Sequence, residues 1–74
     1  EAVEVTVPSG WTPEERWLRA DGRGSVILLA KDIQGTWHKS SYLWDEQDKD
    51  FKTSDRWMTL DEAPDLTGFQ QGLW

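Results

Sequence analysis

The residues of this chain that could do chemistry are a lone histidine and two serines in the stretch "GTWHKSSYLW", residues 35–44. In a strand, His38 and Ser40 point to the same face because side chains alternate with a period of two. A serine nucleophile needs such a base within hydrogen-bond reach. The sequence lacks the G-x-S-x-G turn that exposes the nucleophile in one large class of hydrolases. We therefore interpret His38 as a solvated or hydrogen-bonded side chain and predict a protein that is not an enzyme.

The acidic stretch "DEQDKD", residues 45–50, is a second candidate, for calcium. An EF-hand loop needs oxygen ligands at alternate positions, a glycine at the sixth and a glutamate at the twelfth. Counted from Asp45, the third position is Gln47, the fifth is Lys49 and the sixth is Asp50, so the pattern fails. The sequence predicts a solvated hairpin loop here, with no metal and no cofactor.

Six tryptophans are the compositional anomaly of a chain of 74 residues. A buried tryptophan removes roughly 150–250 Å² from water, and a domain of this size has little other apolar area to bury. We therefore expect most of the rings in the core. Trp and Tyr also dominate interface energetics, so one or two rings could serve recognition. We expect Trp37 inside, and Tyr42 and Trp44 at the rim beside the acidic loop.

The relative orientation of Trp37 and Trp44 depends on the regularity of their strand. Seven positions separate them, so a regular strand places the two rings on opposite faces. A bulge at Ser40 and Ser41, which shifts the register by one residue, or a break there into two short strands would align them on one face. The sequence leaves both arrangements open.

The formal net charge of −6 is concentrated in the second half of the chain. Residues 45–74 contain eight acidic and three basic residues. Direct nucleic-acid binding needs clustered Lys and Arg, so we predict none and expect instead a protein partner with a basic surface. The sequence has no apolar run long enough to cross a membrane. The absence of cysteine excludes disulfides and is compatible with a cytoplasmic location.

The elements that would position these residues read as an α+β fold. "AVEVTV", residues 2–7, alternates as a half-buried strand. "TPEERWLRA", residues 12–20, predicts a helix of about two turns, with Thr12 as N-cap, Pro13 at the first helical position and Glu15 completing a capping box.

Three strands follow the predicted helix. The continuous apolar run in "GSVILLAKD", residues 24–32, indicates a central strand, and "DIQG" turns it into the aromatic strand at 35–44. "FKTSDRWMTL", residues 51–60, returns after the acidic loop. We predict one domain over 1–74: a strand and short helix in 1–23, a mainly antiparallel sheet in 24–60, making about four strands in all, and a C-terminal tail over 61–74 packed on the sheet.

The stretch from "GSVILLAKD" through the aromatic strand to "DRWMTLDEAPD", residues 24–65, is similar to a small phage and prophage family, domain of unknown function 551. Trp57, Met58, Leu60 and Pro64 match the Trp-Met-x-Leu-Pro-like ending of that family, whereas Asp61 stands where proline is common. The resemblance implies a small accessory protein in a bacterial cytoplasm and no particular activity. "PSGW…DGRG…QGTW", residues 8–37, also resembles a WW domain, but "VILLA" replaces the aromatic strand of that family, and we do not adopt the resemblance.

These observations predict a non-enzymatic acidic module, phage-associated, that binds and occludes a basic surface of a host protein. The predicted partner-binding residues are the aromatic and acidic side chains Tyr42, Trp44, Asp45, Glu46, Asp48, Asp50 and Trp74. An alternative is a structural subunit that docks into a larger assembly through the aromatic tail; the tail could equally be a lid. A weaker alternative is carbohydrate or proline-rich peptide binding by exposed rings.

Overall fold

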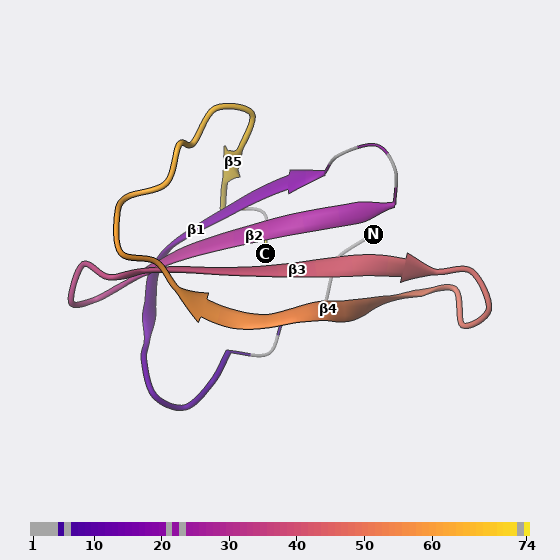
Figure 1. The fold of residues 1–74 in the computed structure, drawn as a ribbon, viewed down its shortest axis with the longest axis horizontal. Helices are drawn as coiled ribbons and strands as arrows, with labels where there is room; N and C mark the ends of the chain where they lie inside the picture. The colour runs from indigo at the N-terminus through magenta and orange to yellow at the C-terminus, as the bar shows by residue number, and fades with distance from the viewer. Residues whose placement is uncertain (1–4, 6, 21, 23, 73) are drawn as a thin grey trace.

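The computed structural model of the chain describes residues 5, 7–20, 22, 24–72 and 74. These residues form one five-stranded sheet in which every neighbouring pair is antiparallel and the order is β4-β3-β2-β1-β5 (Figure 1). Its strands are β1 (Pro13–Ala20), β2 (Ser25–Asp32), β3 (Trp37–Asp45), β4 (Asp50–Thr59) and β5 (Gln70–Gln71). The prediction of a strand over 2–7 falls largely on residues outside the described part.

The α+β prediction is wrong: no helix occurs among the described residues, and the fold is all-β. The segment predicted as a helix is strand β1, which pairs with β2 from Pro13 opposite Asp32 to Ala20 opposite Val26. A helix of two turns is unstable alone, whereas the strand gains a ladder on β2. Pro13 lies at the first strand position, where its missing N–H is tolerated. Local capping signals were therefore overridden by pairing with the most apolar strand.

Strand β2 is the centre of the molecule, as its continuous apolar run predicted. Leu28 and Leu29 are 0% and 2% exposed although they point to opposite faces. Leu28 belongs to a face that we call the ring face, where Val26 and Tyr42 are buried. Leu29 belongs to the opposite face, which we call the crossover face. Both faces of the sheet are therefore covered.

The crossover face is covered by residues 60–69, which we call the crossover. The chain leaves β4 at one edge of the sheet, passes over this face and joins the opposite edge as β5 beside β1 (Figure 1). The Leu60 N–H donates to the Trp37 carbonyl over 2.8 Å at the start, and the Gly72 N–H donates to the Arg16 carbonyl over 2.8 Å just beyond its end. Backbone hydrogen bonds thus tie the segment to the sheet on both sides.

The ring face carries a continuous row of rings. The Trp11 ring stacks on His38 with 3.9 Å between centroids, and its other neighbour is Trp57, at 5.3 Å and edge-on. Trp57 contacts Trp74 at 5.5 Å, and the Trp74 indole N–H donates to the Trp17 carbonyl over 2.9 Å. The row joins the N-terminal segment, β3, β4 and the C-terminal segment on a single face.

The pairing of β2 with β3 is regular from Ser25 opposite Leu43 to Lys31 opposite Trp37. Trp37 and Trp44 therefore lie on opposite faces, which decides between the two arrangements left open by the sequence. The irregularities fall between β3 and β4 instead, on either side of Ser41. Trp37 is half-buried.

The fully buried position of Leu28 predicts that Leu28→Ala lowers the free energy of unfolding by about 2–5 kcal/mol, since it leaves a cavity in the ring-face core. Leu43→Ala is the matched control, because Leu43 is 51% exposed. Urea unfolding followed by tryptophan fluorescence measures both. Equal effects of the two substitutions would contradict the assigned centre of the core.

Candidate functional site

The β3–β4 turn is an ordered acidic tip, which we define as residues 45–50. The Asp45 carboxylate accepts hydrogen bonds from the backbone N–H groups of Gln47 and Asp48, over 2.9 and 3.2 Å. Lys49 has a positive φ of 54°, and the Asp50 carboxylate accepts from the Phe51 N–H. Residues 46–50 are exposed. The turn thus holds its acidic side chains in water, at the end of a hairpin that extends beyond β1 and β2 (Figure 1).

Lysines reduce the negative charge of the acidic tip without cancelling it. Lys49 lies 3.6 Å from Glu46, and Lys52 lies 3.2 Å from Asp48. The hydrogen bond to Asp48, with the nearby carboxylates, raises the pKa of Lys52. Such exposed pairs contribute little to stability and are screened by salt. Four carboxylates against two lysines leave the hairpin end negative.

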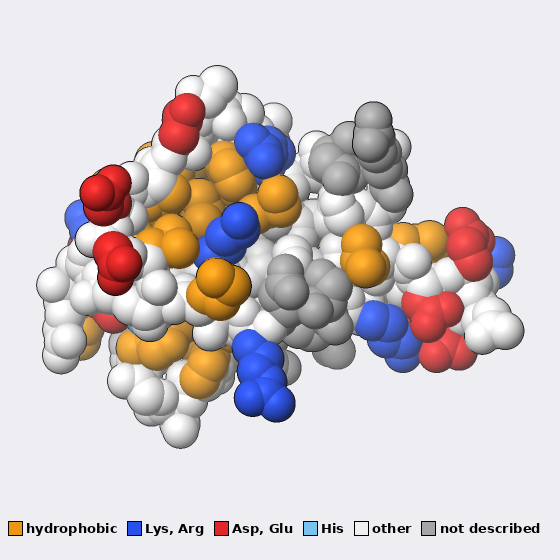
Figure 2. Space-filling view, viewed as in Figure 1, with side chains coloured by type: hydrophobic (Ala, Val, Ile, Leu, Met, Phe, Trp, Pro, Cys, Tyr) orange, Lys and Arg blue, Asp and Glu red, His pale blue; other side chains and the backbone are white. Residues whose placement is uncertain are grey.

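Apolar side chains lie beside the acidic tip. Trp44 is half-buried and meets Phe51 edge-on at 5.1 Å on the ring face. Leu43, on the crossover face, is 51% exposed and lies beside the tip, whereas Met58, 52% exposed on the same face, lies opposite Lys39 near the far end of the hairpin. Figure 2 shows carboxylates and cationic side chains grouped at this end of the molecule, with apolar side chains next to them.

The structure separates the predicted partner-binding residues into two groups. Trp44 and the four acidic residues meet at the hairpin end. Tyr42 is only 5% exposed and belongs to the ring-face core, so the expectation that it lies at the rim is wrong. Val26, directly opposite on β2, takes part in covering it. Trp74 lies in the ring row, across the sheet from β3, with its N–H satisfied within the molecule.

A buried histidine–aspartate pair joins β2 to β3 at the other end of the hairpin. His38 Nε2 lies 2.9 Å from Asp32 Oδ2, and both side chains are more than nine-tenths buried. The other carboxylate oxygen accepts hydrogen bonds from the N–H groups of Gln34 and Thr36. Asp32 therefore orients the imidazole and closes the β2–β3 turn at the same time.

Thr59 and Trp11 complete this polar cluster. The Thr59 hydroxyl lies 3.4 Å from His38 Nδ1, and the Trp11 ring covers the imidazole with an interplanar angle of 1°. A hollow of about 400 Å³ next to the cluster is lined by Ser9, Gly10, Ile33 and Gln34 among others. The order hydroxyl, imidazole, carboxylate is that of a nucleophile relay, but the hydroxyl contact is long and the ring is stacked. The cluster links strands β2, β3 and β4 through side-chain contacts.

This cluster is not predicted from the sequence, because His38 is considered there as a possible base for the serines and not as a hydrogen-bond partner of Asp32. The buried Ser40 lies two residues along the same strand. One signal was present: "DIQGT" begins with an aspartate whose side chain can accept from the turn that follows. In a hairpin, Asp32 and His38 then share one face. Trp11 and Thr59 carry no signal of comparable strength.

Among the described residues, no group of three or more His, Cys, Asp or Glu side chains is arranged to hold a metal ion. The described part of the chain also contains no helix long and apolar enough to span a membrane.

No protein-family model, curated protein or solved structure matches this chain. The resemblance to the phage family of unknown function gains no support from these comparisons and stays a prediction.

The Asp32–His38 pair predicts acid-sensitive folding. The hydrogen bond to His38, followed by those from Thr36 and Gln34, lowers the pKa of Asp32 below its ordinary value. A carboxyl group with a lowered pKa stabilises the fold above its unfolded pKa, near pH 4, and loses this contribution as the pH falls through the folded pKa. We expect the urea concentration at the unfolding midpoint to decrease when the pH is lowered below about 4.

Asp32→Asn should lower the urea midpoint at neutral pH and flatten its decline in acid. Asp61→Asn, at an exposed carboxylate, is the matched control and should follow the parent protein. An Asp32→Asn variant with the parent pH profile would show that the pair does not stabilise the fold.

Proposed function

We propose that this chain is a non-enzymatic protein-binding module that recognises a basic, partly apolar surface of a partner protein through its β3–β4 hairpin. The observation that carries the proposal is the ordered acidic tip, exposed at the end of the hairpin with Leu43 beside it. Carboxylates at a protruding end are available to a partner without disturbing the core.

The charged and apolar groups have different roles in this proposal. Carboxylates at the rim of an interface steer association and make it salt-dependent, whereas buried apolar and aromatic contacts carry most of the affinity. Leu43 supplies exposed apolar area on one face of the hairpin, and Trp44 supplies the accessible part of a ring on the other. The hairpin would thus insert between basic side chains of the partner and cover them.

A nucleic-acid-handling protein offers a suitable surface, because phosphate binding requires clustered Lys and Arg. Occlusion of that surface would inhibit such a protein. The bacterial cytoplasm as the setting, and a phage-associated origin, depend on the resemblance drawn from the sequence.

The alternative of a subunit that docks through its aromatic tail receives less support from the described contacts. Trp74 packs on the core and donates its indole N–H to Trp17. Docking into a neighbour would first have to break these contacts.

The proposed electrostatic role of the acidic tip is tested with a labelled amphipathic peptide of alternating Lys and Leu, which serves as a basic, apolar probe. We expect the triple variant Glu46→Gln, Asp48→Asn, Asp50→Asn to bind it more weakly and to lose most of the salt dependence, measured by fluorescence anisotropy from low salt to roughly 0.5 M. The single variants Glu46→Gln and Glu14→Gln form a matched pair, because each removes one charge from an exposed glutamate and Glu14 lies on β1, outside both the acidic tip and the crossover-face pocket. Equal weakening by both variants, or affinity independent of salt, would refute steering by the tip.

The apolar part is tested by Leu43→Ser in the same assay at fixed salt. We expect about a fivefold loss of affinity, equivalent to about 1 kcal/mol, because the leucine would be covered in the complex. Ile33→Ser is the control: Ile33 is 65% exposed but lies in the β2–β3 turn, at the opposite end of the hairpin. Equal losses for both variants would indicate nonspecific apolar contact.

A further inference from the structure

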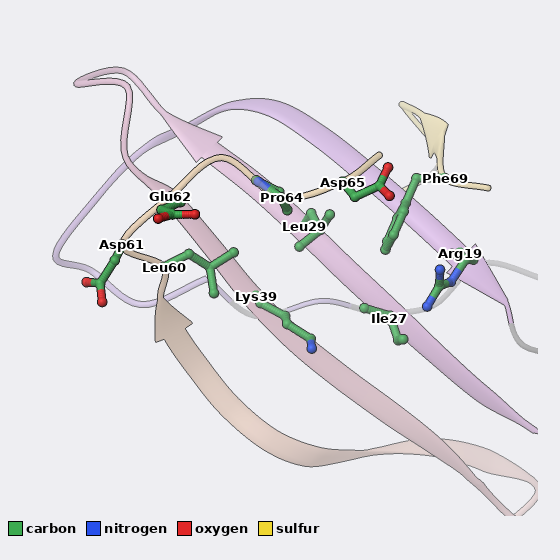
Figure 3. A pocket seen from close by; sticks show the side chains of 10 residues that line it. All are labelled: Arg19, Ile27, Leu29, Lys39, Leu60, Asp61, Glu62, Pro64, Asp65 and Phe69. Atoms are coloured by element: carbon green, nitrogen blue, oxygen red, sulfur yellow. The ribbon is translucent and has the colours of Figure 1, made fainter. Parts of the chain in front are cut away.

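The crossover and the sheet line an open pocket of about 560 Å³ on the crossover face (Figure 3). Strand β2 supplies its floor, and the crossover supplies its wall. Its apolar lining is Ile27, Leu29, Leu60, Pro64 and Phe69. Figure 2 shows the same hollow as a cluster of apolar side chains with carboxylates and cations around it. Its volume lies within the range of about 300–1,000 Å³ that is typical of small-molecule sites.

The charged groups of the pocket are separated along its length. Asp61 and Glu62 lie at the end where the crossover leaves β4. Lys39 reaches across the floor toward Ile27, and Arg19 lies beyond it at the opposite end. Apolar side chains occupy the space between the two ends.

One of the two cations is already engaged within the protein. The Arg19 guanidinium lies 4.8 Å from the centre of the Phe69 ring. Arg19 also lies close enough to Asp65 to contribute to a lowered pKa of that carboxyl, after the larger effect of the hydrogen bonds from Thr67. A side chain at Gly68 would crowd Arg19, because an added Cβ would lie 3.3 Å from its Cδ atom. Arg19 therefore helps to hold the wall in place.

The remaining charges have no ion pair with other described residues. Lys39 is exposed, with its ammonium group beside Ile27, and Asp61 with Glu62 are exposed at the end where the crossover leaves β4. A ligand complementary to this layout has a cationic group, an apolar body and an anionic group, in that order.

We propose that the pocket binds a small zwitterion with an apolar body, of the kind formed by an apolar amino acid or short apolar peptide with free termini. Its ammonium group faces Asp61 and Glu62, its carboxylate faces Lys39, and its apolar side chains lie over Ile27 and Leu60. This site is separate from the acidic tip and independent of the proposed partner binding.

The test uses trileucine in four forms: free, N-acetylated, C-amidated, and blocked at both ends. Binding is measured by NMR titration, with the backbone amides of Ile27, Leu60 and Phe69 as reporters. We expect the free peptide to bind tightest and each block to weaken binding by about threefold to fivefold, the effect of losing one exposed ion pair.

Variants assign each end of the ligand. Lys39→Gln should abolish the preference for a free carboxylate, and the double variant Asp61→Asn, Glu62→Gln should abolish the preference for a free ammonium group. Lys52→Gln is the matched control, since this lysine lies on β4 outside the pocket and pairs with Asp48. The acidic-tip triple variant should bind all four peptides as the parent does.

Three results would overturn the proposal. Equal binding of the free and doubly blocked peptides would show an apolar pocket without charge recognition. Tightest binding of the C-amidated form would show a cation site in which Lys39 contacts no anion. Absence of shifts at the reporter amides would show that the pocket does not take up the peptide.

Discussion

Both faces of the sheet have to be covered by segments without regular structure, and the rest of the fold depends on how this is done. Strand β2 is buried on either side, so neither face can be left in water. On the crossover face, residues 60–69 lie over β2 and re-enter the sheet as β5. On the ring face, Trp11 arrives from the N-terminal segment and Trp74 from the C-terminal one. Apolar area that a helix would supply in a larger domain comes here from single large rings.

Because aromatic rings cover the sheet, the number of side chains that remain available to bind a partner is limited. Tyr42 is part of the core and Trp74 is part of the cover, and a core made from so few side chains cannot release them at low cost. The hairpin end is different, because β3 and β4 extend beyond β1 and β2 and their turn is stabilised by its own aspartates. The crossover creates a second opportunity: a segment lying over a sheet without filling the space beneath it leaves a lined pocket.

Much of the sheet could be predicted from the sequence, because the patterns of several separate segments agree with one another as well as with their own local structure. The apolar run of β2, the turn at residues 33–35 and the return strand through Trp57 are consistent with one antiparallel arrangement. The segment 13–20 shows where prediction from local sequence fails. Its capping box favours a helix locally, but pairing along β2 stabilises a strand more than a helix of two turns could be stabilised.

The candidate sites were predictable only in part. Acidic residues at a hairpin turn indicate exposure, and the structure places them there. The burial of Tyr42 and the Asp32–His38 contact depend on which face each strand presents, and that follows from the register between strands rather than from any single segment. The pocket could not be foreseen at all, because its two sides are far apart in the sequence and meet only through the crossover.

The segment after β4 is part of the cover of the sheet rather than a free tail. Urea unfolding of a chain lacking residues 67–74, followed by tryptophan fluorescence and near-UV circular dichroism, tests this claim directly. The truncation removes β5 and Trp74, so we expect loss of the cooperative transition and of the near-UV signal of packed rings. A truncated chain that unfolds cooperatively at the midpoint of the full chain would contradict it.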